Sequence, residues 1–118
     1  WHATDAESMP VASDSYPDLA TKGAYSPRAV FSHDDIRNVV AYARDRGVRV
    51  VAEFDMPGHN YAWSLDPNLT SLFVNCSDLY PIAQRYWVGS FDPTNEDVYT
   101  FLDTFLGEMA GLFPHPVM

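Results

Sequence analysis

An apolar run that stops at a proline–glycine pair constrains this chain more than any other feature of its sequence. Residues 48–52 are typical of a buried strand, and Pro57-Gly58 cannot extend that strand. Two carboxylates, Glu53 and Asp55, follow the apolar run, and the imidazole of His59 comes directly after the turn. We expect these side chains at the end of the strand, where ligands bind in parallel α/β folds.

Helical periodicity flanks this strand on both sides. Upstream, Ser32 and Asp35 form a variant of the capping box. The apolar residues that follow recur at helical spacing: Ile36, Val39, Val40 and Ala43. A second helical face begins after Thr94, and its residues are expected to be core: Val98, Phe101, Leu102, Phe105, Leu106, Met109 and Leu112. The order helix, strand, helix predicts one α/β domain over residues 1–118 with a parallel sheet.

Two long segments lack periodicity, and we expect both to be ordered loops. Residues 9–31 are rich in proline, serine and glycine, and long loops in compact folds are usually functional. The second loop follows His59 and reaches Pro93. Its aromatic residues either plug the core or form a binding platform: Trp63, Phe73, Tyr80, Tyr86, Trp87 and Phe91.

The charge balance argues against nucleic acid as a partner. The chain has 16 acidic and 7 basic residues, a net charge of −9, and no basic run, whereas phosphate binding needs clustered Lys and Arg. No apolar stretch approaches the roughly 18 residues of a membrane span. Because the chain begins at Trp1, with neither an initiator methionine nor a signal peptide, we expect a piece of a longer protein.

Two Asn-x-Ser/Thr patterns lie close together, at Asn68 and Asn75. Such patterns arise often by chance, yet the pair suggests glycosylation and a lysosomal or secreted location. The single cysteine, Cys76, excludes an internal disulfide framework and a thiolate-rich zinc site.

A second combination of histidine and aspartate occurs at the N-terminus, in His2 and Asp5. An imidazole bonded to a carboxylate is fixed in tautomer and orientation and can tune a third group. If both strands end on one rim, Asp5 and His59 lie within hydrogen-bond reach, about 2.6–3.2 Å. Alternatively, His59 is a turn histidine that bonds a backbone carbonyl, and Asp5 caps a loop.

The remaining polar residues allow two further interpretations. Glu53 and Asp55 share one face of the strand and present two acids to a pocket, or they form a buried ion pair. A metal alternative gathers four ligands around zinc or manganese: His2, Asp5, Asp55 and His59. We favour a site without metal or cofactor, and we expect His33 and His115 at the surface.

Nearly the whole chain resembles the β-N-acetylhexosaminidases of glycoside hydrolase family 20. Its most specific motif is Glu53-Phe54-Asp55-Met56-Pro57-Gly58-His59, which is similar to the family's Glu-Phe/Ile-Asp-x-Pro-Gly-His. The other segments that resemble the family are Trp1-His2-Ala3-Thr4-Asp5, Ser15-Tyr16-Pro17-Asp18-Leu19, Lys22-Gly23-Ala24-Tyr25-Ser26, Tyr42-Ala43-Arg44, Arg46-Gly47-Val48-Arg49-Val50, Phe91-Asp92-Pro93-Thr94-Asn95 and Leu112-Phe113-Pro114.

The resemblance implies a partial (β/α)8 TIM barrel, about strands 2 to 3 with their following helices. It also implies exo-acting removal of terminal N-acetylglucosamine or N-acetylgalactosamine from oligosaccharides or glycoconjugates, with the sugar's own acetamido oxygen as nucleophile, an exception to two-carboxylate hydrolysis. Asp5 and His59 match catalytic residues that link toward the general acid. The matching supporting residues are His2, Glu53 and Asp55.

The sequence departs from the family pattern at one decisive point. The family's His-x-Gly-Gly-Asp-Glu, with its general acid, does not occur in these 118 residues. We therefore expect the polypeptide alone to be inactive and to fold poorly, because unpaired strand edges and an uncovered apolar face remain. The resemblance gives Cys76 a partner outside the segment. A metal-dependent hydrolase, a silent sugar-binding relative and a dimeric parent stay open.

Overall fold

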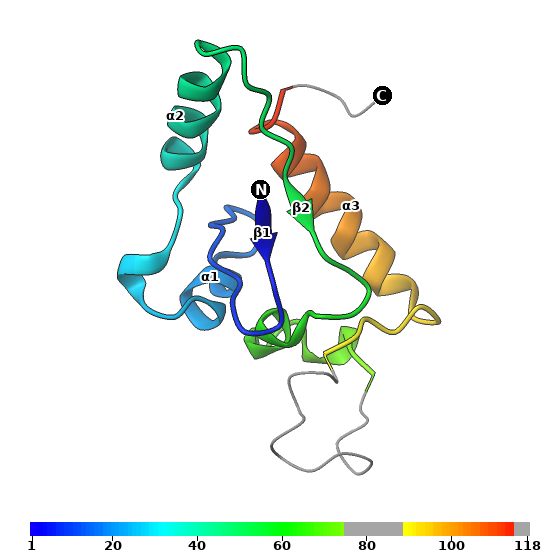
Figure 1. Ribbon diagram of the computed structural model, residues 1–118. Coiled ribbons are helices and arrows are strands. Elements are labelled where there is room, and N and C mark those ends of the chain that lie inside the picture. The colour runs from blue at the N-terminus through cyan, green and yellow to red at the C-terminus, as the bar shows by residue number, and fades with distance from the viewer. Residues whose placement is uncertain (75–88, 115–118) are drawn as a thin grey trace.

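The computed structural model describes residues 1–74 and 89–114 of the chain. These residues form a parallel pair of short strands between helices, which confirms the expected α/β class. In Figure 1 the strands point the same way, with α2 on the β1 side and α3 on the β2 side. The elements are β1 (His2–Thr4), α1 (Pro17–Gly23), α2 (His33–Arg44), β2 (Glu53–Phe54) and α3 (Glu96–Ala110), with 3-10 turns at Pro27–Ala29, Tyr61–Leu65 and Thr70–Leu72.

The strand pair is shorter and less covered than the sequence predicts. His2 lies opposite Glu53 in the parallel register, and the Glu53 N–H donates to the Trp1 carbonyl at 2.7 Å. The apolar run before β2 is not buried, since Val48 and Val51 are 56% and 47% exposed. Among the described residues β2 pairs only with β1, and a strand is buried along its length only when neighbours cover it. The prediction of a buried strand over residues 48–52 is therefore wrong.

Helix α2 begins as its sequence predicts. The Asp35 N–H donates to Ser32 Oγ at 3.2 Å, and the Ser32 N–H donates to Asp35 Oδ2 at 2.9 Å, which completes the capping box. The buried face is narrower than expected, because Ile36 and Val40 are buried while Val39 is 43% exposed. After the helix, Gly47 has φ 69°, the left-handed conformation that glycine adopts without strain.

Residues 9–31, expected to be a loop, contain α1. Pro17 lies in the first turn, where its missing N–H costs nothing, and Lys22 lies in the last turn. At 7 residues the helix is too short to show periodicity in the sequence. A Cβ added at Gly23 would lie 2.7 Å from Met9 Cβ and 2.8 Å from the Ala62 carbonyl oxygen, so only glycine fits there.

Trp63 is the centre of the core. Its side chain is fully buried, and its ring centroid lies 5.0 Å from that of Phe105, 5.8 Å from Phe91 and 6.5 Å from Phe54. These steeply tilted or edge-on contacts join the second loop to α3 and β2, so Trp63 plugs the core and does not form a binding platform. The core face of α3 is confirmed for its buried members, Val98, Phe101, Phe105 and Met109.

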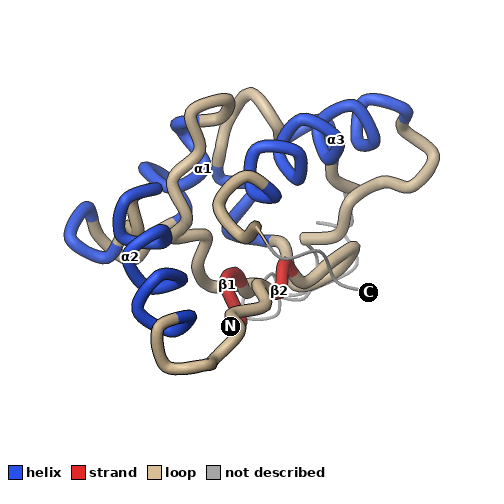
Figure 2. Tube along the Cα trace, turned by 90° about the horizontal axis from the view of Figure 1, so that it is seen from above, coloured by secondary structure: helices blue, strands red, loops and turns tan. Residues whose placement is uncertain are grey.

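Several residues for which the sequence predicted a role or a location lie outside the described part of the chain: Asn75, Cys76, Tyr80, Tyr86, Trp87 and His115. Figure 2 shows β1 and β2 side by side and all three α-helices around them. No helix among the described residues is both long enough and apolar enough to cross a membrane.

Candidate functional site

The ends of β1 and β2 bring five polar side chains to one edge of the strand pair. We call this group the rim cluster: His2, Asp5, Glu53, Asp55 and His59. All five are partly open to solvent, with side-chain exposures from 38% to 65%. The sequence predicted the approach of two strand ends, and the parallel register of β1 and β2 confirms it.

His2 bridges the two strands through both of its ring nitrogens. Nε2 lies 2.8 Å from Asp5 Oδ2, and Nδ1 is hydrogen-bonded to Glu53 Oε1. The hydrogen bond with Asp5, followed by that with Glu53, raises the pKa of His2. In return, the bond from His2 and the Ala6 N–H, 2.6 Å from Asp5 Oδ1, lower the pKa of Asp5.

His59 pairs with the other carboxylate of the β2 segment. Its Nδ1 lies 2.8 Å from Asp55 Oδ2, and this hydrogen bond raises the pKa of His59. The backbone of His59 has φ 58°, a left-handed conformation that is uncommon for residues other than glycine. Such conformations persist only where the surroundings enforce them, and they cluster at active sites.

Asn60 holds this turn through its side chain and backbone, and no pattern in the sequence singled it out. The side chain is fully buried, and its Nδ2 donates to the Asp55 carbonyl at 2.7 Å. The Asn60 N–H donates to the Gly89 carbonyl at 2.9 Å, and a Cβ at Gly89 would lie 2.3 Å from Tyr61. The only local signal was an asparagine directly after the Gly-His pair.

The prediction of a hydrogen bond between Asp5 and His59 is wrong. Among the described residues, Asp5 binds His2 and the Ala6 N–H, and His59 binds Asp55. Each side chain takes a partner on its own segment, because that partner is already within reach once the local turn forms. The charges of Asp5 and His59 still interact, since Asp5 contributes to the raised pKa of His59.

The structure also tests the alternatives for the rim cluster. His59 bonds a carboxylate, and the Asp5 carboxylate accepts the next backbone N–H as a loop cap does. Glu53 and Asp55 each take a histidine and stay partly exposed, unlike a buried ion pair. The metal alternative loses support, because in the described residues no three members of the rim cluster bring ligand atoms within 4.8 Å of one another.

A different group does meet that spacing, and we call it the clasp cluster: Asp14, His33 and Glu108. His33 Nε2 lies 3.1 Å from Glu108 Oε1, and both side chains are only 14% exposed. The prediction of a surface His33 is therefore wrong. Its partner is distant in sequence, so no local pattern could have revealed the contact.

Glu108 is the hub of the clasp cluster. Its carboxylate accepts the Asp14 N–H at 2.6 Å, the Ser13 hydroxyl at 2.8 Å and the Ser15 N–H at 3.2 Å. Burial by itself would raise the pKa of Glu108, but the hydrogen bonds from Asp14, Ser13 and Ser15 outweigh it and lower the pKa. The clasp thus ties the loop after β1 to the last turn of α3.

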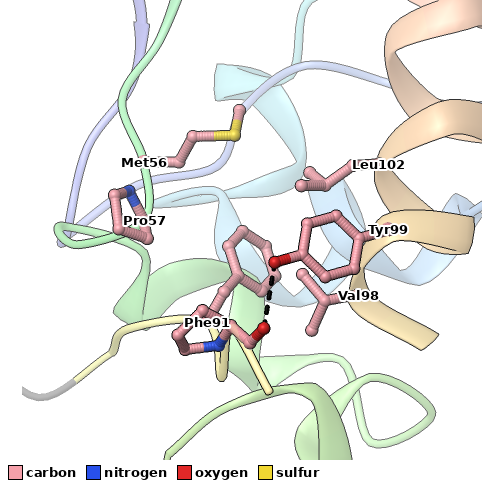
Figure 3. Close-up of a pocket in the computed structure, with 7 residues that line it drawn as sticks. Met56, Pro57, Phe91, Val98, Tyr99 and Leu102 are labelled. Atoms are coloured by element: carbon pink, nitrogen blue, oxygen red, sulfur yellow. Dashed lines mark hydrogen bonds between the residues drawn. The ribbon is translucent and has the colours of Figure 1, made fainter. Parts of the chain in front are cut away.

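An apolar pocket of about 130 Å³ lies beside the turn, between the end of β2 and α3 (Figure 3). Its lining contains no member of the rim cluster, and the Tyr99 hydroxyl is already bonded to the Pro93 carbonyl at 2.9 Å. The remaining lining is Met56, Pro57, Phe91, Val98 and Leu102. This surface offers shape and apolar contact without a group for acid–base chemistry.

The sequence model of the catalytic domain of glycosyl hydrolase family 20 matches residues 1–118, which include both strand ends and the rim cluster. The chain belongs to glycosyl hydrolase family 20. The resemblance expected from the Glu53 to His59 motif is thereby confirmed.

Relatives within family 20 are enzymes by name. The chain is 45% identical over 113 residues to "Beta-hexosaminidase subunit A1" of Dictyostelium discoideum, covering 96% of this chain and 20% of that protein. It is 38% identical over 114 residues to human "Beta-hexosaminidase subunit beta", covering 97% and 20%. The chain thus spans about a fifth of the length of these relatives.

A solved family 20 structure shares the fold. The exo β-N-acetylglucosaminidase from Vibrio harveyi, solved in complex with N-acetylglucosamine, superimposes with a TM-score of 0.79 at 30% identity. The match covers 98% of this chain and 21% of that enzyme. The short strand pair and its helices are therefore arranged as in a much longer family 20 protein.

Proposed function

We propose that this chain is a segment of an exo-acting β-N-acetylhexosaminidase. The whole enzyme would hydrolyse terminal N-acetylglucosamine or N-acetylgalactosamine from oligosaccharides or glycoconjugates, by substrate-assisted catalysis with retention. The observation that carries the proposal is the rim cluster, two histidine–carboxylate groups at adjacent parallel strand ends in a family 20 chain. Hexosaminidase names among the relatives support the same substrate class.

The proposed architecture is part of a (β/α)8 barrel, in which β1 and β2 are strands 2 and 3. The parallel pairing and the helix after each strand support this placement, as does the similarity to the longer Vibrio harveyi enzyme. In such barrels the catalytic side chains lie at the carboxyl ends of the strands. Asp5, Asp55 and His59 follow the two strands, while His2 and Glu53 are their first residues.

Within this site, Asp5 and His59 would tune the general acid, and His2, Glu53 and Asp55 would support them. His59 Nδ1 is hydrogen-bonded to Asp55 Oδ2 at 2.8 Å, and this contact holds the imidazole in one orientation. The enforced left-handed backbone at His59 supports this role, because it fixes the direction of the ring. No step of this chemistry needs a cofactor.

The same proposal predicts where activity resides. The 118 residues lack the Asp-Glu pair that the family resemblance requires, so this polypeptide alone would be inactive. The test compares the purified chain with the full-length protein that contains it, by release of a chromogenic phenol from an N-acetylglucosaminide. We expect turnover from the full-length protein only, and turnover by the isolated chain would contradict the proposal.

Variants of the full-length protein test the residue roles. Asp5→Asn and His59→Gln should each lower kcat by about 10²-fold, the lower end of the range for positioned acid–base groups. Arg37→Ala is the control, because in residues 1–74 and 89–114 Arg37 pairs with Asp34 alone, on the exposed face of α2, and its kcat should stay unchanged. Full activity in both rim variants would remove Asp5 and His59 from the mechanism.

A lysosomal or secreted location is part of the proposal. Asn68 is exposed, as an acceptor of an N-linked glycan must be, and its amide group donates to Asp66 Oδ1 at 3.1 Å. Glycosidase digestion of the natural protein, followed by mass measurement of the peptide that contains Asn68, would detect the glycan.

A further inference from the structure

His2 contacts a carboxylate through each of its two ring nitrogens. Nε2 faces Asp5 and Nδ1 faces Glu53. An ionised carboxylate only accepts hydrogen bonds, and a neutral imidazole donates from one nitrogen and accepts at the other. A neutral His2 would therefore place a ring lone pair against a carboxylate oxygen. This geometry requires either an imidazolium or a protonated carboxyl group.

The surroundings of the two carboxylates favour the imidazolium. Asp5 Oδ1 accepts the Ala6 N–H at 2.6 Å, a bond that stabilises the ionised form of Asp5. The Glu53 side chain is 65% exposed, so its carboxylate is open to water. His2 also lies near His59, and the charge of His2 lowers the pKa of His59, whereas Asp55 and Asp5 raise it.

We propose that His2 is a positioning residue, held as an imidazolium that clamps Asp5, directly after β1, to Glu53 on β2 and so fixes the orientation of the Asp5 carboxylate. This inference rests on the proposed function, in which Asp5 tunes the general acid. His2 does not need to touch the sugar. Its contribution is to neutralise the repulsion between two carboxylates and to join the two strand ends.

The clamp has a defined dependence on pH. The bonds to Asp5 and Glu53 raise the pKa of His2, so the clamp is complete below the ordinary histidine value of 6.5 and is lost as pH rises through the raised pKa. Above it, one nitrogen no longer donates and one carboxylate is released. Loss of the clamp would contribute to the alkaline limb of the activity profile.

The experiment combines histidine NMR with kinetics of the full-length protein. Nitrogen chemical shifts of the His2 ring, assigned by their disappearance in His2→Gln, report whether both nitrogens carry protons. We expect both to be protonated at a pH where an ordinary histidine of pKa 6.5 is mostly neutral. Glu53→Gln removes one clamp partner and should move the His2 titration to lower pH.

The kinetic measurements distinguish a positioning role of His2 in catalysis from a contribution to stability alone. His2→Gln should lower kcat about tenfold, equivalent to about 1.4 kcal/mol, with KM changed less than about twofold because no substrate contact is lost. Its alkaline limb should also shift. His33→Gln is the matched control, because His33 belongs to the clasp cluster, and this variant should lower stability while leaving the pH profile in place.

Two results would overturn the clamp. One is a His2 ring that is neutral at pH 7 with both carboxylates intact, and the other is a His2→Gln enzyme with unchanged kcat and pH profile. If the full-length wild type shows no hexosaminidase activity, the proposed function fails by itself. The NMR titration then still decides whether His2 is an imidazolium between Asp5 and Glu53.

Discussion

The rim cluster and the clasp cluster use the same chemistry, histidine against carboxylate, for different purposes. In the rim, Glu53 is 65% exposed and contacts one histidine. In the clasp, Glu108 is 14% exposed, lies 3.1 Å from His33 Nε2 and accepts hydrogen bonds from three groups of the loop at residues 13–15. The difference lies in solvent access and in how many acceptor positions are already occupied.

This comparison shows why residue types alone do not locate a site. The clasp satisfies the spacing of a metal site, yet its carboxylate is occupied by backbone and hydroxyl donors that fix a loop. The rim fails that spacing, yet its side chains are partly exposed, and the pKa values of His2, Asp5 and His59 are shifted. Exposed, charged and incompletely occupied groups are the better functional candidates.

The largest expected effect in this comparison is on stability. Glu108→Gln should lower the free energy of unfolding by about 2–4 kcal/mol, because charge-assisted hydrogen bonds are lost and buried donors of the loop face an amide NH₂. Glu53→Gln is the matched substitution in the rim and should cost less than about 1 kcal/mol, as exposed ion pairs do. Urea unfolding of the full-length protein measures both. Equal losses would break the distinction between clasp and rim.

A smaller effect tests whether the clasp depends on the start of α2, next to His33. Ser32→Ala removes the N-cap of the capping box and should cost about 1 kcal/mol. We expect this loss to add to that of Glu108→Gln in the double variant if the cap and the clasp act independently. A double variant no less stable than Glu108→Gln alone would show that Ser32 acts through the clasp.

The smallest effect is the pH dependence of stability, because protonated Glu108 still accepts hydrogen bonds. The pKa of Glu108 is lowered on folding, so its contribution is present above the unfolded value of 4.5 and is lost as pH falls through the folded pKa. His2 and His59 act in the opposite direction, since their raised pKa values make their contribution fade as pH rises above 6.5. The unfolding midpoints of the wild type and of Glu108→Gln, measured across pH, separate the effect of Glu108 in acid from that of the two histidines at higher pH. If the midpoint of Glu108→Gln falls in acid as steeply as that of the wild type, the role of Glu108 is contradicted.

Local patterns in the sequence predicted the features that depend on near neighbours. The capping box at Ser32 and Asp35 formed as expected, and so did the core face of α3 apart from Leu106, which is 39% exposed. Each depends on contacts within a few residues or on a regular periodicity. The sequence also predicted that two strand ends would carry the polar residues, because Pro57-Gly58 had to end the second strand.

Local patterns could not predict which side chains contact one another in the folded chain, or which of them are buried. Pairing of Asp5 with His2, burial of His33 against Glu108 and exposure of Val51 depend on which segments lie beside each other. Helix α1 was missed because its length gave no periodic signal. The expected approach of two strand ends brought the rim residues together as a group, but the partner predicted from those ends for Asp5, His59, is not the one that Asp5 binds.

The sequence by itself determined the family, the local helix signals and the five residues of the rim, because a motif and a capping pattern are encoded within short stretches of chain. Only the tertiary structure decided which carboxylate each histidine binds. Several acids lie within reach of each imidazole, and the choice depends on the parallel register of β1 and β2 and on the turn at His59. Hydrogen bonds are sensitive to differences of a few tenths of an ångström, which only the packed chain fixes.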